Sequence, residues 1–319
     1  MVNKFIKSPL NYTGNKHRIL SQMLPYFPSK IGTIVDLFCG GATVGLNVKS
    51  EKTYFIDCDE KVIGLLNYFA NVSFCTLIKE LDEITIKYRL SRSYIYGYKE
   101  FKDTISDSNL NNGLKQYNSD GFYKLRADYN ALSDKASSKA FQMLYILMLY
   151  GFNNDMRFSR DGNYNLPIGK TDLNLSNVKK LKEYIERIQE INAEFICGDF
   201  ESVKVQEIIM ASDFTYMDPP YLITNAVYNE SNKWNEDKEY ALLNMLGTLL
   251  DNKKQFVLSN VLTKKGKRNE PLYYWTTTRK SEIAIIDIDY HYRSASYNKI
   301  NRNACEREVI ILPKDNKND

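Results

Sequence analysis

A short segment near residue 218 constrains the fold more than any other part of the chain. Residues Phe214–Met217 are apolar, aromatic or β-branched, as in a buried strand, and they are followed by Asp218-Pro219-Pro220-Tyr221. Neither proline has an N–H group to donate to a sheet, so the strand cannot continue past Asp218. Each proline also keeps the preceding residue extended. The sequence therefore predicts a rigid corner at the carboxyl end of a strand, which is where open α/β sheets bind ligands.

The chemistry of this corner suits a planar amine. The carboxylate of Asp218 can accept hydrogen bonds from an exocyclic amine, and the carbonyl groups of the two prolines can point the same way. Tyr221 offers a flat face on which a base can stack. The predicted catalytic residues are therefore Asp218, Pro219, Pro220 and Tyr221. Taken alone, the motif also fits a loop aspartate before a proline turn, because short motifs occur by chance.

A second segment predicts the first unit of a nucleotide-binding sheet. The apolar run from Ile34 to Phe38 opens into a turn containing Gly40 and Gly41, and a short amphipathic pattern follows. Asp57 ends the next apolar run, about 20 residues beyond the turn, where this architecture places an acid on ribose hydroxyls. No GxxxxGK[ST] motif is present, so a P-loop is excluded. The glycines do not form GxGxxG, so the signal for a standard dinucleotide-binding fingerprint is weak. A simple strand-to-helix turn would need the same glycines.

The pattern of the whole chain predicts an α/β fold with an inserted helical domain. Seven runs read as strands, namely residues 34–38, 53–57, 193–197, 214–217, 255–260, 281–289 and 307–312. Helical periodicity dominates between them, from residue 61 to 190. We therefore expect one domain from residues 1–60 and 191–319 and a second from residues 61–190. Residues 103–121 are rich in Asn, Ser, Asp and Gly and are expected to form a flexible insertion.

The inserted region contains a candidate DNA-binding ribbon. Arg157-Phe158-Ser159 and Asn163-Tyr164-Asn165 flank a turn at Asp161-Gly162, a strong hairpin signal. An exposed ribbon that carries Arg, Asn, Asp and Ser can enter a major groove, although a polar surface hairpin would have the same composition. The predicted DNA-contacting residues are Arg126, Asn153, Asp155, Arg157, Ser159 and Pro167.

Composition narrows the class of protein. The net charge of +4 is compatible with a polyanionic partner without requiring one. The five cysteines form no CxxC pair and there are only two histidines, so we expect no metal site and reduced thiols in a cytoplasm. No apolar stretch reaches the roughly 18–20 residues of a membrane span, and the N-terminus has no signal-peptide pattern.

Taken in order, the motifs resemble those of the Dam-type DNA adenine-N6 methyltransferases (D12 class, α group), and most closely those of T-even phage Dam enzymes. The motifs are Tyr12-Thr13-Gly14-Asn15-Lys16, Asp36-Leu37-Phe38-Cys39-Gly40-Gly41, Asp57, Asp199-Phe200 and Asp218-Pro219-Pro220-Tyr221, with further likeness at Tyr221-Leu222-Ile223-Thr224 and Leu258-Ser259-Asn260-Val261. The resemblance covers most of the chain, and the order of the motifs is as specific as their content.

The resemblance implies a Rossmann-like, seven-stranded methyltransferase domain that binds S-adenosylmethionine, with an inserted target-recognition domain that carries the hairpin. The cofactor-binding positions that it implies are Tyr12, Lys16, Asp36, Phe38, Gly40, Asp57, Asp199, Phe200 and Asp218. Arg157 would read bases. The single target that the resemblance implies is GATC, but Asn153, Asp155, Ser159 and Thr171 differ from the residues expected of a GATC-reading phage enzyme.

The implied activity is methyl transfer from S-adenosylmethionine to N6 of an adenine flipped out of duplex DNA, without a metal. Duplex DNA would be the partner, in the cytoplasm of a bacterium or a phage-infected bacterium, with a separate restriction endonuclease in a restriction–modification setting. Two alternatives stay open: methylation of RNA or of a protein amide, and a catalytically inactive DNA-binding relative. A nucleotide-binding oxidoreductase would lack its glycine fingerprint and would leave the ribbon unexplained.

Overall fold

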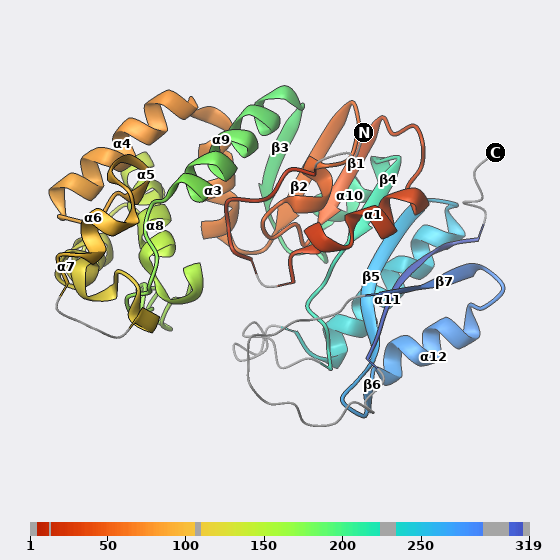
Figure 1. Ribbon diagram of the computed structural model, residues 1–319. Helices are drawn as coiled ribbons and strands as arrows, with labels where there is room; N and C mark the ends of the chain where they lie inside the picture. The colour runs from red at the N-terminus through yellow and green to blue at the C-terminus, as the bar shows by residue number, and fades with distance from the viewer. Residues whose placement is uncertain (1–4, 13, 106–109, 224–233, 290–305, 315–319) are drawn as a thin grey trace. The chain divides into compact units, whose positions relative to one another are not determined.

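The structure is a computed structural model, which describes residues 5–12, 14–105, 110–223, 234–289 and 306–314 (Figure 1). The chain forms two compact units. Unit 1 comprises Met1–Asn15 and Glu60–Glu190, and unit 2 comprises Lys16–Asp59 and Ile191–Asp319. Residues 1–15 thus group with the helical unit, whereas the sequence placed them with the sheet. One contact joins this segment to the rest of unit 1: the Asn11 side-chain amide donates a hydrogen bond of 2.6 Å to the Asn153 carbonyl.

Unit 2 is built on a mixed sheet with the order β3-β2-β1-β4-β5-β8-β7, and β6 pairs with β5 beside this path. The strands are β1 (Thr33–Leu37), β2 (Lys52–Asp57), β3 (Ala193–Cys197), β4 (Phe214–Met217), β5 (Gln255–Lys264), β6 (Lys267–Arg268), β7 (Ile283–Ile288) and β8 (Arg307–Pro313). Strands β1 to β5 are parallel, and β8 lies antiparallel between β5 and β7. The α/β fold and all seven expected strands are confirmed, and the two-residue β6 is an addition.

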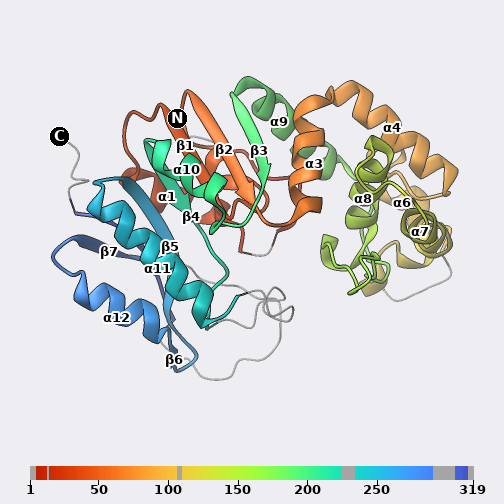
Figure 2. The same ribbon diagram turned by 180° about the vertical axis from the view of Figure 1, so that it is seen from behind.

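Helices cover both faces of this sheet. They are η1 (Lys16–Arg18), α1 (Leu20–Met23), η2 (Leu24–Tyr26), α2 (Thr43–Leu46), α10 (Val203–Ala211), α11 (Glu236–Asp251) and α12 (Glu270–Thr278). Figures 1 and 2 show α11 and α12 on one face and α1 on the other. Every residue of β4 is buried, as expected of a parallel strand that is covered on both sides. The sequence analysis did not identify α12, although Asn269 caps it by accepting the Leu272 N–H group.

The strand order reverses between β1 and β4, and this topological switch point positions the candidate site. From β1 the chain continues outward to β2 and β3, whereas β4 continues in the opposite direction to β5. Leu37 and Met217 end their strands in register, and the Asp218 N–H group donates to the Leu37 carbonyl at 3.3 Å. The proline corner therefore lies directly beside the glycine turn, where α/β sheets of this kind bind ligands.

Unit 1 is mainly helical. Its helices are α3 (Glu60–Asn71), α4 (Phe74–Lys87), α5 (Ser93–Tyr96), α6 (Tyr98–Lys102), η3 (Leu110–Asn112), α7 (Lys115–Asn130), α8 (Ser138–Tyr150), η4 (Phe152–Asn154) and α9 (Leu175–Glu190). Most of α8 is buried, so this helix forms the centre of the unit.

The expectation of a flexible insertion over residues 103–121 is wrong for its last part, because α7 begins at Lys115. A polar composition does not exclude a packed helix here, because Asn118 is buried and its side-chain oxygen accepts a 2.7 Å hydrogen bond from the Ser91 N–H group. Residues 106–109 of this stretch lie outside the described residues.

The predicted hairpin is present in unit 1. Phe158 and Tyr164 form an antiparallel bridge, the Ser159 N–H group donates to the Asn163 carbonyl at 2.8 Å, and the Asn165 N–H group donates to the Arg157 carbonyl at 3.1 Å. Gly162 supplies the left-handed conformation that the turn needs, with φ of 75°.

Within the residues that the structure describes, no helix has the length and apolar character needed to cross a membrane.

Candidate active site

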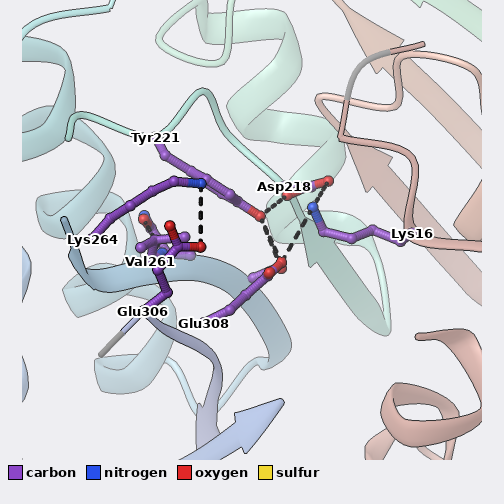
Figure 3. A network of polar contacts seen from close by, with 9 residues as sticks. Lys16, Asp218, Tyr221, Val261, Lys264, Glu306 and Glu308 are labelled. Carbon is purple, nitrogen blue, oxygen red and sulfur yellow. Dashed lines mark hydrogen bonds and ion pairs between the residues drawn. The ribbon is translucent and has the colours of Figure 1, made fainter. Parts of the chain in front are cut away.

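The proline corner holds a carboxylate fixed by two donors from different parts of unit 2. Lys16 Nζ, from η1, lies 2.9 Å from Asp218 Oδ2, and the Tyr221 hydroxyl donates to Asp218 Oδ1 at 2.8 Å (Figure 3). The lysine is only 4% exposed, and its Nζ atom also lies 5.0 Å from the centre of the Tyr221 ring. The sequence identified Lys16 and Asp218 as separate motifs, and the structure brings them into one ion pair.

Strand β8 adds a second carboxylate to this corner. Glu308 Oε1 lies 3.7 Å from Lys16 Nζ and 3.4 Å from the Tyr221 hydroxyl oxygen, which is itself 3.3 Å from Ser259 Oγ (Figure 3). The sequence analysis missed Glu308. Its only local signal is an acid near the start of an apolar strand, and that strand reaches this edge of the sheet because it runs antiparallel to β5.

Burial dominates the electrostatics of the acids around the switch point. Burial raises the pKa of Asp218, and the charge and hydrogen bond of Lys16 offset this only in part. The pKa of Asp36 rises to about 8, first because of burial and then because of the nearby charges of Asp218 and Asp57, although the Gly45 N–H group opposes the change. A cationic ligand beside these acids would relieve their repulsion.

The glycine turn after β1 is held by the two predicted acids. Asp57 Oδ2 accepts the Gly40 N–H group at 2.9 Å, and Asp36 Oδ2 accepts the Gly45 N–H group at 2.7 Å. Phe38 adopts a left-handed backbone conformation with φ of 61°, which costs a non-glycine residue about 1–3 kcal/mol and is typical of functional sites. Asp36 therefore fixes the turn, and Asp57 links the turn to the end of β2.

Three aromatic rings pack together beside this turn. The ring centres of Phe38, Phe200 and Trp234 lie 5.5 to 5.7 Å apart. We call these three residues the aromatic cluster. The indole N–H group of Trp234 donates to the buried carboxylate of Glu239 at 2.8 Å, which fixes the orientation of the ring. The sequence predicted Phe38 and Phe200 for the site but not Trp234.

The other predicted cofactor residues have local partners. Asp199 Oδ2 forms a 2.9 Å ion pair with Lys238. Although burial acts to raise it, the Glu201 N–H group and Lys238 hold the pKa of Asp199 below its usual value. Tyr12 belongs to unit 1, where its carbonyl accepts the Asn15 N–H group at 3.3 Å.

The side chains in and around the hairpin differ in exposure and in the hydrogen bonds they make within unit 1. Arg157 is exposed, and its Nε atom donates to Asn165 Oδ1 at 2.8 Å across the hairpin. Arg126 instead braces the hairpin by donating to the Leu166 carbonyl at 3.0 Å. The hydroxyl of Thr171, one of the positions that differ from a GATC-reading phage enzyme, donates to the Leu149 carbonyl at 3.0 Å.

The remaining candidates for DNA contact shape the hairpin through short-range hydrogen bonds. Asp155 Oδ1 accepts the Met156 N–H group at 2.8 Å, and Ser159 Oγ accepts the Asn163 N–H group at 3.3 Å. Pro167 is exposed, and Asn153 is exposed with a left-handed backbone. The structure thus presents Arg157, Asn153 and Pro167 at the surface of unit 1.

In the described ranges, no three His, Cys, Asp or Glu residues are grouped so that they could hold a metal ion.

Comparison with known proteins places the chain in one family. Residues 12–293 match the family model of the D12 class N6 adenine-specific DNA methyltransferases. The type II methyltransferase M.FokI of Planomicrobium okeanokoites is 35% identical over 97% of this chain and 43% of its own length. The modification methylase StsI of Streptococcus sanguinis is 31% identical over 97% of this chain and 43% of its own length. The chain therefore spans less than half the length of these two relatives.

The expected likeness to phage Dam enzymes needs correction. The DNA adenine methylase of Salmonella typhi is 23% identical over 79% of this chain and 79% of its own length, well below the two type II enzymes. The matches thus favour type II modification enzymes over the Dam-like group. With the family model covering residues 12–293, the chain belongs to the D12 class N6 adenine-specific DNA methyltransferases.

Proposed function

We propose that this chain transfers a methyl group from S-adenosylmethionine to N6 of an adenine in a short duplex DNA target. The observation that carries this proposal is the Asp218 carboxylate, fixed by Lys16 and Tyr221 at the switch point of the sheet, within an acid–Pro–Pro–aromatic corner. Unit 1, with its hairpin, is the proposed target-recognition domain, and unit 2 is the proposed catalytic domain.

The residues of unit 2 fit the cofactor. In addition to burial, the charges of Asp218 and Asp57 raise the pKa of Asp36, so a positive charge nearby would stabilise the three acids in their ionised forms. The cofactor carries such a charge on its sulfonium group. The aromatic cluster, in which Phe200 and Trp234 are buried, would form an apolar wall for the adenine ring. Asp57, at the end of β2, would hold ribose hydroxyls, as acids at this position do in sheets of this kind. When bound, the cofactor supplies an electrophilic methyl group.

The corner would act on the target base by position and charge. An adenine flipped out of the duplex, at a cost of a few kcal/mol, would stack on the Tyr221 ring. Asp218 and the Pro219 carbonyl would accept hydrogen bonds from the N6 amine. These bonds would direct the nitrogen lone pair toward the methyl group and stabilise the positive charge that develops on nitrogen. The methylated nitrogen would then lose one of its two hydrogens as a proton to solvent, which gives the neutral N6-methyl amine.

The experiment that tests this function is methyl transfer from labelled S-adenosylmethionine to plasmid DNA, followed by single-molecule sequencing of modified bases. We expect N6-methyladenine confined to one short site. The likeness to type II enzymes leaves GATC as one outcome among several, and the sequencing identifies the site directly. Transfer to RNA or protein instead of DNA, or cofactor binding without any transfer, would contradict the proposal.

We predict that Trp234→Ala weakens cofactor binding about 2- to 10-fold, because aromatic contacts contribute about 0.5–1.5 kcal/mol beyond buried area. Titration calorimetry with S-adenosylmethionine measures this. The chain contains two tryptophans, so Trp275→Ala, in α12, is a matched control. Trp234→Phe should retain most of the affinity. Equal losses in both alanine variants would show that the effect is one of general stability.

We predict that Arg157→Ala lowers kcat/KM about 10- to 100-fold on an unmethylated duplex that carries the target site, because one bidentate contact to a base contributes about 1–3 kcal/mol of discrimination. The cofactor Kd should not change, since Arg157 lies in the hairpin of unit 1. Arg187→Ala, in α9, is the control for loss of one positive charge. An unchanged site preference and unchanged kcat/KM in Arg157→Ala would exclude this residue from base recognition.

A further inference from the structure

Glu308 is placed in the proline corner by two features of the sheet. Strand β8 is antiparallel, so its first residues lie at the edge where the parallel strands end. The pairing of β5 with β8 is also irregular at this point: Val261 pairs with Glu308 but Thr263 pairs with Arg307, which leaves Leu262 as an extra residue. Such bulges occur next to active sites, where they change the direction of a side chain. Glu308 is only 12% exposed and belongs to the buried part of the corner.

The Tyr221 hydroxyl lies closer to one of the two carboxylates of this corner than to the other. The Tyr221 hydroxyl has one hydrogen to donate, and it lies 2.8 Å from Asp218 Oδ1 and 3.4 Å from Glu308 Oε1. The longer distance exceeds that of a fully formed O–H···O bond, so the hydroxyl is committed to Asp218. Ser259 Oγ, at 3.3 Å, and Glu308 are two other acceptors near this hydroxyl, and Glu308 is the one that can carry a negative charge. Lys16, with several hydrogens, reaches both acids at 2.9 and 3.7 Å.

The proposed function requires Asp218 to accept a new donor, the N6 amine of the target adenine. We propose that Glu308 is a positioning residue of this site: it holds Lys16 and takes over the hydrogen bond of the Tyr221 hydroxyl when the target amine donates to Asp218. The inference rests on the proposed function and deepens it. With Glu308 present, Tyr221 and Lys16 have a carboxylate beside them in both arrangements, and a hydrogen bond to a charged group is stronger than one to a neutral group.

The groups facing Glu308 determine how its removal changes the pH dependence. Burial raises the pKa of Glu308; the charges of Lys16 and Lys264 oppose this change, and that of Asp218 adds to it. Tyr221 and Tyr216 are the tyrosines near this carboxylate. Because the coupling between two acids is reciprocal, removing the charge of Glu308 lowers the pKa of Asp218. The acid limb of the rate profile should therefore move to lower pH.

The test compares Glu308→Gln with Glu306→Gln in the full chain. Glu306 is 41% exposed and lies two residues earlier. Its ion pair is with Lys264, at 3.8 Å, and not with Lys16 (Figure 3). We expect Glu308→Gln to lower kcat about 10- to 100-fold, as for a misplaced catalytic group, with the cofactor Kd unchanged and the acid limb moved to lower pH. Glu306→Gln should match the wild type in all three. Equal kcat and equal pH profiles in the two variants would overturn the inference.

A double-mutant cycle with Tyr221→Phe tests the route through the tyrosine hydroxyl. Residues that share a hydrogen-bond network show non-additive effects, so Glu308→Gln should lower kcat less in the Tyr221→Phe background than in the wild type. Strictly additive losses would refute the hydroxyl role. A wild-type chain that methylates no adenine would contradict the proposed function itself. A wild-type chain that methylates adenine, together with a Glu308→Gln variant that retains the wild-type kcat, would contradict only the inference about Glu308.

Discussion

Replacing Asp218 with alanine is expected to abolish methyl transfer to DNA while leaving DNA binding and cofactor binding measurable. The expected loss in kcat is about 1000-fold or more, since removing one preorganised group that stabilises developing charge already costs about 100- to 1000-fold. Here the same residue also positions the amine. Asp218 makes the shorter contacts with Lys16 and Tyr221, at 2.9 and 2.8 Å, whereas Glu308 lies 3.7 and 3.4 Å from the same two groups, so Glu308 is not positioned to replace it in full.

Two controls separate this effect from loss of folding. Asp237, exposed in the first turn of α11, provides a matched aspartate-to-alanine change outside the corner. Asp218→Asn keeps the shape but adds N–H donors that face the amine, so it should also lose most activity. Steady-state transfer at saturating substrate measures kcat, and gel shifts with an unmethylated duplex that carries the target site measure DNA binding. Near-normal methyl transfer by the Asp218→Ala variant would contradict the proposed mechanism.

The pH dependence of the wild type follows from the same residue. Asp218 must be ionised to accept the amine hydrogens, and burial raises its pKa above the ordinary value. The rate should therefore fall as pH decreases through this raised pKa, at a higher pH than an exposed aspartate would give.

The parts of this site that local sequence predicts are those that local chemistry dictates. Two consecutive prolines must end β4 at Asp218, and the glycine turn must follow an apolar run at β1. The strand boundaries agree with the predicted runs to within two residues except for β5, which continues to Lys264 instead of ending at Asn260. The helix α12 was missed although Asn269 and Pro271 mark its start, because the segment is short and weakly periodic.

Long-range pairing explains what the sequence did not reveal. Glu308 enters the corner only because β8 is inserted antiparallel between β5 and β7, and no local pattern encodes that direction. Trp234 joins Phe38 and Phe200 from a distant part of the chain. Residues 115–121 looked like a loop by composition, yet Asn118 is buried because Ser91 supplies its partner. In each case a contact far along the chain overrides local preference.

Lys16→Met is expected to have the largest effect on stability. Lys16 is buried against two acids, and Asp218 and Glu308 are only 19% and 12% exposed. Removing one partner of a buried ion pair leaves an uncompensated charge, which costs about 3–5 kcal/mol in the free energy of unfolding near neutral pH. Methionine keeps the length and apolar stem of lysine, so little of this loss would come from packing. Urea unfolding at several pH values measures it.

The sign of the pH dependence distinguishes a charge effect from a packing effect. Burial already raises the pKa values of Asp218 and Glu308, and removing Lys16 raises both further. Below their ordinary pKa values both acids are protonated in the folded and unfolded states, so the deficit of Lys16→Met should be smallest there. It should grow as pH rises and be complete above the folded-state pKa values. Lys182→Met, which removes an exposed lysine 3.7 Å from Glu186, should change the free energy of unfolding little at any pH.

The same substitution should move the acid limb of activity in the direction opposite to Glu308→Gln. Without Lys16 the pKa of Asp218 rises, so a higher pH is needed to ionise it, whereas without Glu308 the pKa falls. Measuring both rate profiles therefore tests whether the three side chains act as one electrostatic unit. Shifts in the same direction would mean that the two variants act through the structure of the corner rather than through the charge on Asp218.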